Sequence, residues 1–80
     1  MVRIVPSKRF LKDIKNVDQF GREKIEKQIR KILENPNVGK PLRYQRGERS
    51  LYIKPFRLIY VIRGDELILL KFDHRKKVYK

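Results

Sequence analysis

Three cationic side chains and a tyrosine stand near the ends of predicted strands in the second half of the chain: Lys54, Arg57, Arg75 and Tyr79. Arginine and lysine at such positions can bind phosphate groups, because both donate charged hydrogen bonds to phosphate oxygens. When consecutive strands pair as a meander, residues far apart in the sequence can meet on one face. The spacing therefore allows a phosphate-handling site. It equally fits an Arg57 that reaches solvent and a Tyr79 that covers the edge of the core.

Other catalytic chemistries lack the residues that they need. The chain has no cysteine and a single histidine, His74, so we expect no metal site and no cofactor. It also has no glycine-rich phosphate loop and no serine with a base at recognisable spacing. Asp73 could orient the His74 imidazole, but pairing with the neighbouring cations is the simpler role for this carboxylate.

The charge balance predicts a polyanionic target. The chain carries 22 Lys and Arg against 9 Asp and Glu, a net charge of +13. A field of this sign on so small a protein attracts nucleic acid through counterion release. A thermophile surface would also be rich in lysine, but such surfaces pair lysine with glutamate in near balance. The sign asymmetry favours nucleic acid or a nucleoprotein as the target.

The length predicts one domain that spans residues 1–80 and has a thin core. No stretch approaches the length of a membrane span, and the apolar residues after Met1 are interrupted by Arg3 and end at Pro6. We therefore expect a soluble, cytoplasmic protein with no membrane partner. Packing, supplemented by a partner chain, must supply its stability.

The first half predicts a short strand and two helices. Val2–Val5 is the strand, and Ser7 suits the N-cap of the first helix, in which Phe10 and Ile14 recur at helical spacing. Asp18 suits the N-cap of a longer helix that ends at Asn35-Pro36. Its apolar stripe consists of Ile25, Ile29, Ile32 and Leu33.

The second half predicts three strands, which are Leu51–Lys54, Phe56–Arg63 and Glu66–His74. The strand Phe56–Arg63 is apolar on both faces and is therefore central, and Gly64-Asp65 predicts a tight hairpin after it. The segment Asn37–Ser50 is interpreted as a loop with a short extended piece near Lys40–Arg43.

The order β-α-α-β-β-β predicts an α+β fold, with an antiparallel sheet of about four strands and a helical hairpin packed on one face. The isoleucine stripe should face Leu58 and Tyr60, or Ile59 and Val61 on the other side of the same strand. Arg57 would then lie on the face away from Phe56 and Leu58.

Several ordered segments together resemble the RelE/ParE superfamily of toxins from toxin–antitoxin pairs. They are Asn35-Pro36, Gly39-Lys40-Pro41-Leu42, Ser50-Leu51-Tyr52-Ile53-Lys54, Phe56-Arg57-Leu58-Ile59-Tyr60 and Asp73-His74-Arg75-Lys76-Lys77-Val78-Tyr79. Phe10-Leu11-Lys12-Asp13 fits the pattern more weakly, so the resemblance covers nearly the whole chain. It implies a fold similar to microbial ribonucleases and, for the RelE branch, cleavage of mRNA on the ribosome.

The resemblance also implies roles for single residues. The cleavage would be an attack of a 2′-OH on the adjacent phosphate, which leaves a 2′,3′-cyclic phosphate. Lys54 matches a lysine that acts as general base or stabilises charge, and Arg57 matches the arginine that binds the scissile phosphate. Arg75 matches an arginine that steadies the transition state and leaving group. Tyr79 matches a tyrosine that stacks on or orients the target nucleotide.

One position departs from the RelE pattern. Tyr52 stands where the pattern has a second lysine, and a tyrosine supplies a hydroxyl but no cation. The alternatives are a ParE-like toxin that inhibits gyrase without nuclease activity and an inactive RNA-binding descendant. Around the four catalytic candidates we expect further RNA contacts from Arg43, Arg46, Arg49, Tyr52, His74, Lys76 and Lys77.

The positive charge implies an acidic partner, which the resemblance identifies as a RelB-like antitoxin. We expect a largely helical, flexible chain that wraps the toxin and covers apolar helix surface. Inhibition should act through bulk or through displacement of the segment 76–80 rather than through carboxylates paired directly with Arg57 and Arg75.

Overall fold

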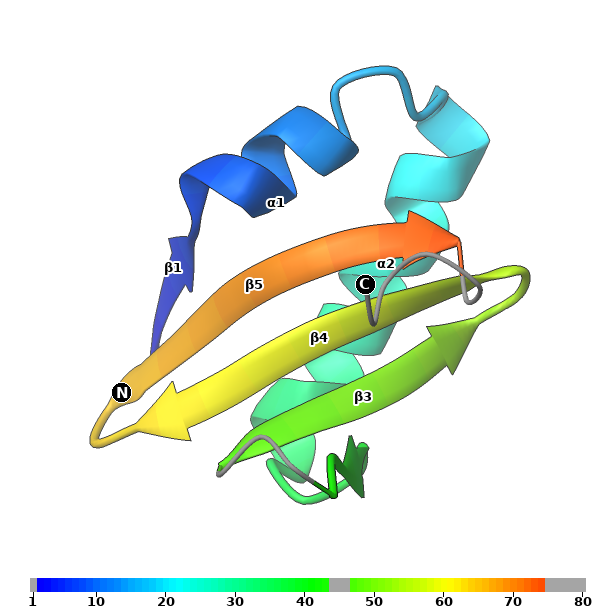
Figure 1. The fold of residues 1–80 in the computed structure, drawn as a ribbon. Coiled ribbons are helices and arrows are strands. Elements are labelled where there is room, and N and C mark those ends of the chain that lie inside the picture. Colours follow the sequence, from blue (N-terminus) through cyan, green and yellow to red (C-terminus); the bar gives the residue numbers. More distant parts are fainter. Residues whose placement is uncertain (1, 44–46, 75–80) are drawn as a thin grey trace.

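The computed structural model describes residues 2–43 and 47–74. Five strands form one sheet in the order β1-β5-β4-β3-β2, and two helices accompany it (Figure 1). In chain order the elements are β1 (Arg3–Pro6), α1 (Lys8–Asp13), α2 (Gln19–Glu34), β2 (Lys40–Pro41), β3 (Glu48–Ile53), β4 (Phe56–Arg63) and β5 (Glu66–His74).

The sheet combines an antiparallel meander with one parallel pair. Strands β3, β4 and β5 pair antiparallel in sequence, β2 pairs antiparallel with β3, and β1 pairs in parallel with β5. The predicted α+β class and the order β-α-α-β-β-β are confirmed. The sheet is mixed and has five strands rather than being antiparallel with about four. The parallel pair is possible because both helices and three strands separate β1 from β5, so no tight turn joins them.

The strand boundaries differ from the prediction at β3. This strand begins at Glu48 rather than Leu51, because Gly47 adopts a φ of 79° and turns the chain immediately before it. Glu48 then pairs with Val61 and extends the ladder toward the far end of β4. The extended piece expected near Lys40–Arg43 is present as the two-residue strand β2.

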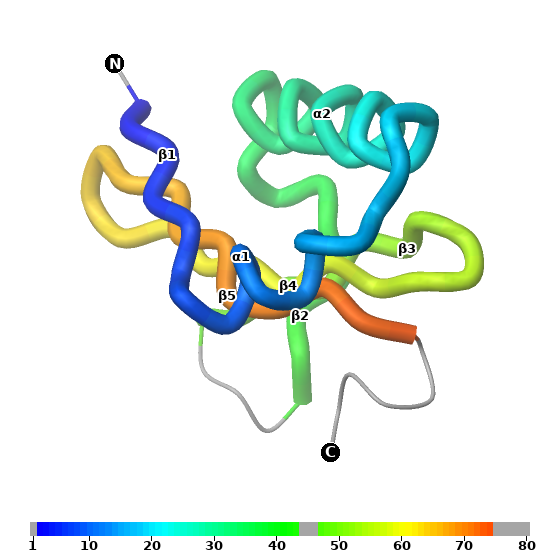
Figure 2. Tube along the Cα trace, turned by 90° about the horizontal axis from the view of Figure 1, so that it is seen from above, coloured from blue at the N-terminus to red at the C-terminus, as the bar shows by residue number. Residues whose placement is uncertain are grey.

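The helices begin at the predicted caps. The Ser7 hydroxyl accepts the N–H of Phe10 at 3.0 Å, and the Asp18 carboxylate accepts the N–H of Gly21 at 2.8 Å. Figure 2 shows α2 lying across one face of the sheet, while α1 lies along the β5 edge. Both helices nevertheless contribute buried side chains to one core on the same side of the sheet, as predicted. The opposite face has no helix over it among the described residues.

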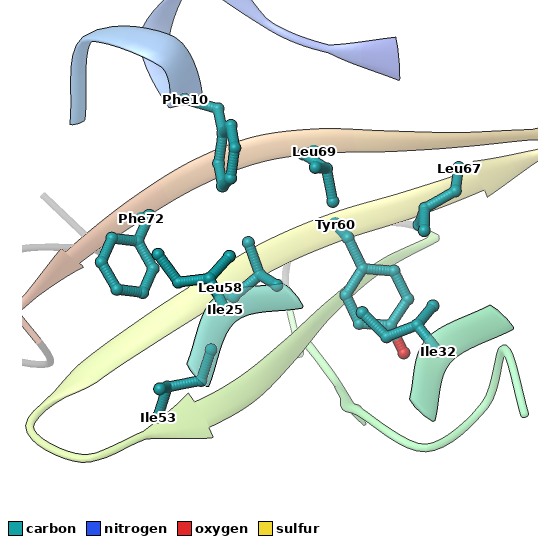
Figure 3. Close-up of a cluster of buried hydrophobic side chains, with 9 residues drawn as sticks. All are labelled: Phe10, Ile25, Ile32, Ile53, Leu58, Tyr60, Leu67, Leu69 and Phe72. Atoms are coloured by element: carbon teal, nitrogen blue, oxygen red, sulfur yellow. The ribbon is translucent and has the colours of Figure 1, made fainter. Parts of the chain in front are cut away.

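The main core lies between α2, α1 and the sheet (Figure 3). Ile25 and Ile32 are buried against Leu58 and Tyr60, as predicted, and Ile29 is partly buried beside them. Leu33 was predicted in the same stripe, but it is 38% exposed. It lies about 100° around the helix from Ile32 and so points away from the sheet.

A smaller apolar layer lies on the opposite face of the sheet. Ile59 is 1% exposed and Val61 is 7% exposed, and both alternate along β4 with the core-facing Leu58 and Tyr60. The side chain of Ser50, which pairs with Ile59 from β3, is also buried. The prediction of a central strand with two apolar faces is therefore confirmed.

Tyr60 links the sheet to the loop after α2. Its buried hydroxyl donates to the Pro36 carbonyl at 2.8 Å and accepts the N–H of Gly39 at 3.0 Å. A side chain at Gly39 would meet the Tyr60 ring at 2.8 Å, so the loop can approach this closely only with glycine there. The hydroxyl thus holds the loop over the end of the core.

We expect Tyr60→Phe to lower the free energy of unfolding by about 1–3 kcal/mol, because the Pro36 carbonyl and the Gly39 N–H lose a buried partner. Urea denaturation measures the change. Tyr52→Phe is the matched control, since Tyr52 is 41% exposed whereas Tyr60 is fully buried, and it should stay within about 0.5 kcal/mol of the parent. Equal losses in the two variants would contradict the buried role of the Tyr60 hydroxyl.

Candidate nucleic-acid interface

The face of the sheet opposite α2 carries a cation on its central strand, close to the turn between β3 and β4. Arg57 of β4 pairs with Tyr52 of β3 on one side and with Asp73 of β5 on the other. Because residues directly opposite each other share a face, all three side chains belong to the face that α2 leaves uncovered. We call this the open face.

The Arg57 guanidinium stacks on an aromatic ring. Its central carbon lies 4.7 Å from the ring centroid of Tyr52, whose side chain is 41% exposed. This cation–π contact restricts the rotamers of Arg57. The remaining N–H groups can bind two oxygens of a phosphate at once. Tyr52 stands where the RelE pattern has a second lysine. In this chain the tyrosine positions the arginine that faces it in the ladder.

The carboxylate next to Arg57 is engaged elsewhere. Asp73 lies opposite Arg57 in the ladder, but its Oδ2 pairs with the guanidinium of Arg9 at 3.3 Å. Arg9 also binds Asp13 at 2.9 Å, and this neighbour raises the pKa of Arg9. Within residues 2–43 and 47–74, no carboxylate forms an ion pair with Arg57. The open face therefore keeps a positive charge near the turn between β3 and β4.

The same carboxylates anchor α1 to the sheet. Asp13 Oδ2 accepts the backbone N–H of Phe72 at 3.0 Å, which supplies a partner to β5 beyond the end of β1. Sequence reasoning missed Arg9 and Asp13. Their separation of four residues on a helix was the available signal, because such pairs lie on one helix face.

Lys54 follows β3 directly, two residues after Tyr52 and three before Arg57. It is exposed in the turn between β3 and β4, and it lines a cleft together with the first turn of α2. Part of Lys54 therefore borders the helix side of the sheet. Arg75 and Tyr79, the other two catalytic candidates, lie outside the described residues, so the predicted meeting of all four side chains stays a prediction.

The remaining RNA-contact candidates have different placements. The Arg49 guanidinium donates to the Gly39 carbonyl at 2.7 Å and the Asn37 carbonyl at 3.3 Å, which ties the loop after α2 to β3. His74 is half-buried with its ring edge-on to Phe56, and Arg43 is exposed. Arg46, Lys76 and Lys77 lie outside the described residues.

Two classes of site are not found in the part of the chain that the structure describes. There, no group of three or more histidine or acidic side chains could hold a metal ion. In the same residues, no helix is both long and apolar enough to span a bilayer.

Comparisons with known proteins agree with this fold. A family model described as "ParE toxin of type II toxin-antitoxin system, parDE" matches residues 4–79. No curated protein sequence gives a significant match.

Three solved structures illustrate the similarity. The RelB–RelE antitoxin–toxin complex from Methanococcus jannaschii has 22% identity and a TM-score of 0.76, with 94% of each chain covered. A YoeB/ParE toxin from Agrobacterium tumefaciens has 21% identity and a TM-score of 0.83, with 92% of this chain and 99% of that chain covered. The chromosomal ParDE system from P. aeruginosa has 18% identity and a TM-score of 0.71, with 92% and 96% covered. At such identities the likeness shows the fold.

Removing Arg9 should weaken nucleic-acid binding indirectly. In Arg9→Ala the Asp73 carboxylate loses its partner and can pair with Arg57 across the ladder, where facing Cβ atoms are roughly 5 Å apart. We expect the affinity for a 2′-O-methyl RNA oligonucleotide, measured by fluorescence anisotropy, to fall severalfold more than in Lys8→Ala, which removes a charge from the neighbouring residue.

The double variant Arg9→Ala/Asp73→Asn should recover most of this loss, because the competing carboxylate is gone. If Arg9→Ala and Lys8→Ala weaken binding equally, Arg9 acts only through its net charge.

Proposed function

The chain belongs to the ParE toxin family of type II toxin–antitoxin systems, and we propose that this toxin cleaves mRNA on the ribosome. The observation that carries the proposal is the Arg57 guanidinium, stacked on Tyr52 and free of a carboxylate partner among the described residues, on a sheet face that no described helix covers. A preoriented guanidinium on such a face suits a phosphodiester in a nucleic acid.

In the proposed reaction the 2′-OH of one nucleotide attacks the adjacent phosphate, and the 5′-oxygen of the next nucleotide leaves. The products are a 2′,3′-cyclic phosphate and a 5′-OH. Arg57 binds the scissile phosphate and stabilises the charge that builds up on its oxygens. Lys54 acts as the general base that takes the proton of the 2′-OH, or as a second cation that stabilises the charge on the phosphate. Arg75 assists the departure of the 5′-oxygen, and Tyr79 stacks on or orients the target nucleotide, as the family resemblance implies.

As a toxin of such a pair, the protein has an antitoxin partner. The structural relatives from Methanococcus jannaschii and E. coli are RelB–RelE antitoxin–toxin complexes, which supports this pairing. We propose that the antitoxin is acidic, because a net charge of +13 favours partners of opposite sign and speeds their encounter.

A second function is favoured by two observations. The matching family model describes ParE toxins, and Lys54 lines a cleft on the helix side of the sheet. Both suit a gyrase-inhibiting toxin that needs no catalytic lysine. An assay that reads RNA cleavage and DNA supercoiling in parallel separates the two functions.

We expect Arg57→Ala to slow cleavage of a reporter mRNA by roughly 100-fold or more, because one charge-stabilising donor set is lost from the transition state. Primer extension in a cell-free translation reaction measures the cleavage. Arg63→Ala is the matched control. Arg63 lies on the same strand and face, about 20 Å from Arg57, and its loss should change the rate by less than about threefold.

Arg57→Lys keeps the charge but loses the two-oxygen geometry, and it should fall between the parent and Arg57→Ala. A parent toxin that leaves mRNA intact and stops gyrase from supercoiling a plasmid would reject the ribonuclease proposal and establish the second function.

A further inference from the structure

A second binding feature lies on the helix side of the sheet. The start of α2 faces the turn between β3 and β4 in both views (Figures 1 and 2). Between them is a cleft of about 130 Å³, which the structure lines with residues from both segments and from the end of β5. The open-face contact of Arg57 and Tyr52 takes no part in it.

The floor of the cleft is apolar and already packed. Phe56 and Phe72 stack with ring centroids 5.0 Å apart, and Ile53 and Val17 complete the floor. Ile53 and Phe72 are buried core residues, so the floor is continuous with the main core (Figure 3). A floor of this kind gains from covering by another apolar side chain.

An exposed aromatic side chain forms one wall. Phe20 in the first turn of α2 is 66% exposed, the most exposed of the large hydrophobic side chains in the described residues. The Lys24 ammonium lies 4.6 Å from its ring centroid, and this cation–π contact restricts the ring. A phenylalanine left in water next to an apolar cleft marks a surface suited to a partner.

The rim of the cleft carries two cations, Lys24 and Lys54, and one carboxylate, Asp18. Asp18 is the N-cap of α2 and accepts the N–H of Gly21. The partial positive charge of the helix N-terminus therefore offsets part of its negative charge. The two lysines have no such internal carboxylate partner among the described residues. The rim therefore favours carboxylates on either side of an apolar group.

We propose that this cleft binds an acidic segment of the antitoxin through one apolar anchor side chain flanked by glutamates or aspartates. The anchor enters between Phe20 and the Phe56–Phe72 pair, and the flanking carboxylates pair with Lys24 and Lys54. The inference rests on the proposed pairing with an acidic antitoxin and identifies where that chain is held.

The size and lining of the cleft favour a peptide over RNA. A volume of about 130 Å³ suits a single leucine-sized or phenylalanine-sized side chain. The floor offers carbon atoms rather than the donors and acceptors that read the edge of a base.

Lys54 connects the cleft to the proposed catalytic chemistry. A carboxylate that pairs with Lys54 from the cleft engages the ammonium on which the RNA reaction depends in our proposal. The antitoxin would then inhibit without covering Arg57.

The test is an NMR titration of the uniformly ¹⁵N-labelled toxin with three probes. The first is a capped synthetic peptide with one leucine between two pairs of glutamates. The second is the same peptide with glycine in place of leucine, and the third is a 2′-O-methyl oligouridylate. We expect the leucine peptide to shift the amide signals of Phe20, Gly21, Lys24 and Ile53 in particular, and the glycine peptide to bind roughly tenfold more weakly.

Variants of the cleft sharpen the comparison. Phe20→Ala should weaken the leucine peptide by roughly tenfold or more, and Lys24→Ala should weaken it severalfold at low salt. Lys31→Ala is the matched control, because it removes the same charge two turns further along α2 and outside the cleft. It should change the affinity by less than about twofold.

Several outcomes would overturn the inference. These are equal binding of the leucine and glycine peptides, shifts confined to other parts of the chain, equal losses in Lys24→Ala and Lys31→Ala, and oligouridylate shifts at the cleft in place of peptide shifts. The cleavage assay is read separately, so a toxin that cuts no RNA but binds the leucine peptide in the cleft would reject the proposed reaction alone.

Discussion

A single irregularity in the β4–β5 ladder decides how the two faces of this sheet are populated. Ile59 pairs with Lys71, but the next residue, Tyr60, pairs with Leu69, so Leu70 is an extra residue on β5. Without this bulge, Lys71 and Asp73 would continue the core-facing alternation of Leu67 and Leu69. With it, Phe72 and His74 turn toward α2, and Lys71 and Asp73 turn to the open face.

The bulge is held by the segment that joins β1 to α1. The N–H of Ser7 donates to the Leu69 carbonyl at 2.9 Å, and its hydroxyl donates to the Leu70 carbonyl at 2.8 Å. The same hydroxyl caps α1, and α1 carries Arg9 and Asp13 to the far part of β5. The N-terminal segment therefore engages Asp73 and leaves Arg57 without a carboxylate partner among the described residues. A slip of one residue in β5 would bring a lysine into the core and remove Phe72 from it.

Local signals in the sequence were sufficient for the elements but not for their long-range partners. Ser7 and Asp18 marked the helix starts because a cap acts within three residues. The alternation along Phe56–Arg63 marked β4 because burial on both faces leaves few polar positions. The bulge could not be predicted, since Leu67, Ile68, Leu69 and Leu70 are equally apolar and only the ladder chooses among them. The pairing of Arg9 with Asp73, 64 residues away, likewise depends on the folded chain.

The candidate site shows the same division. Arg57 was placed on the correct face by strand alternation, and its stacking on Tyr52 follows from the register of β3. The use of Arg49 could not be foreseen, because its guanidinium binds carbonyls of a loop whose path depends on the Tyr60 hydroxyl. A basic sequence does not show which of its cations form internal contacts in the folded chain. In the described structure Arg9 is bound to carboxylates and Arg49 to backbone carbonyls, whereas Arg57 contacts an aromatic ring.

The position of Lys54 couples the two proposed binding events, that of RNA and that of the antitoxin segment. If RNA on the open face and an acidic segment in the cleft both use this ammonium, each must lower the affinity of the other by the same factor. Such coupling acts even when the two ligands occupy opposite sides of the sheet. Lys54 stands in the turn between β3 and β4, at the edge where the two sides meet. An inhibitor of this kind needs to neutralise one lysine rather than cover the whole open face. The large positive charge elsewhere on the chain can then steer the antitoxin without taking part in the inhibition itself.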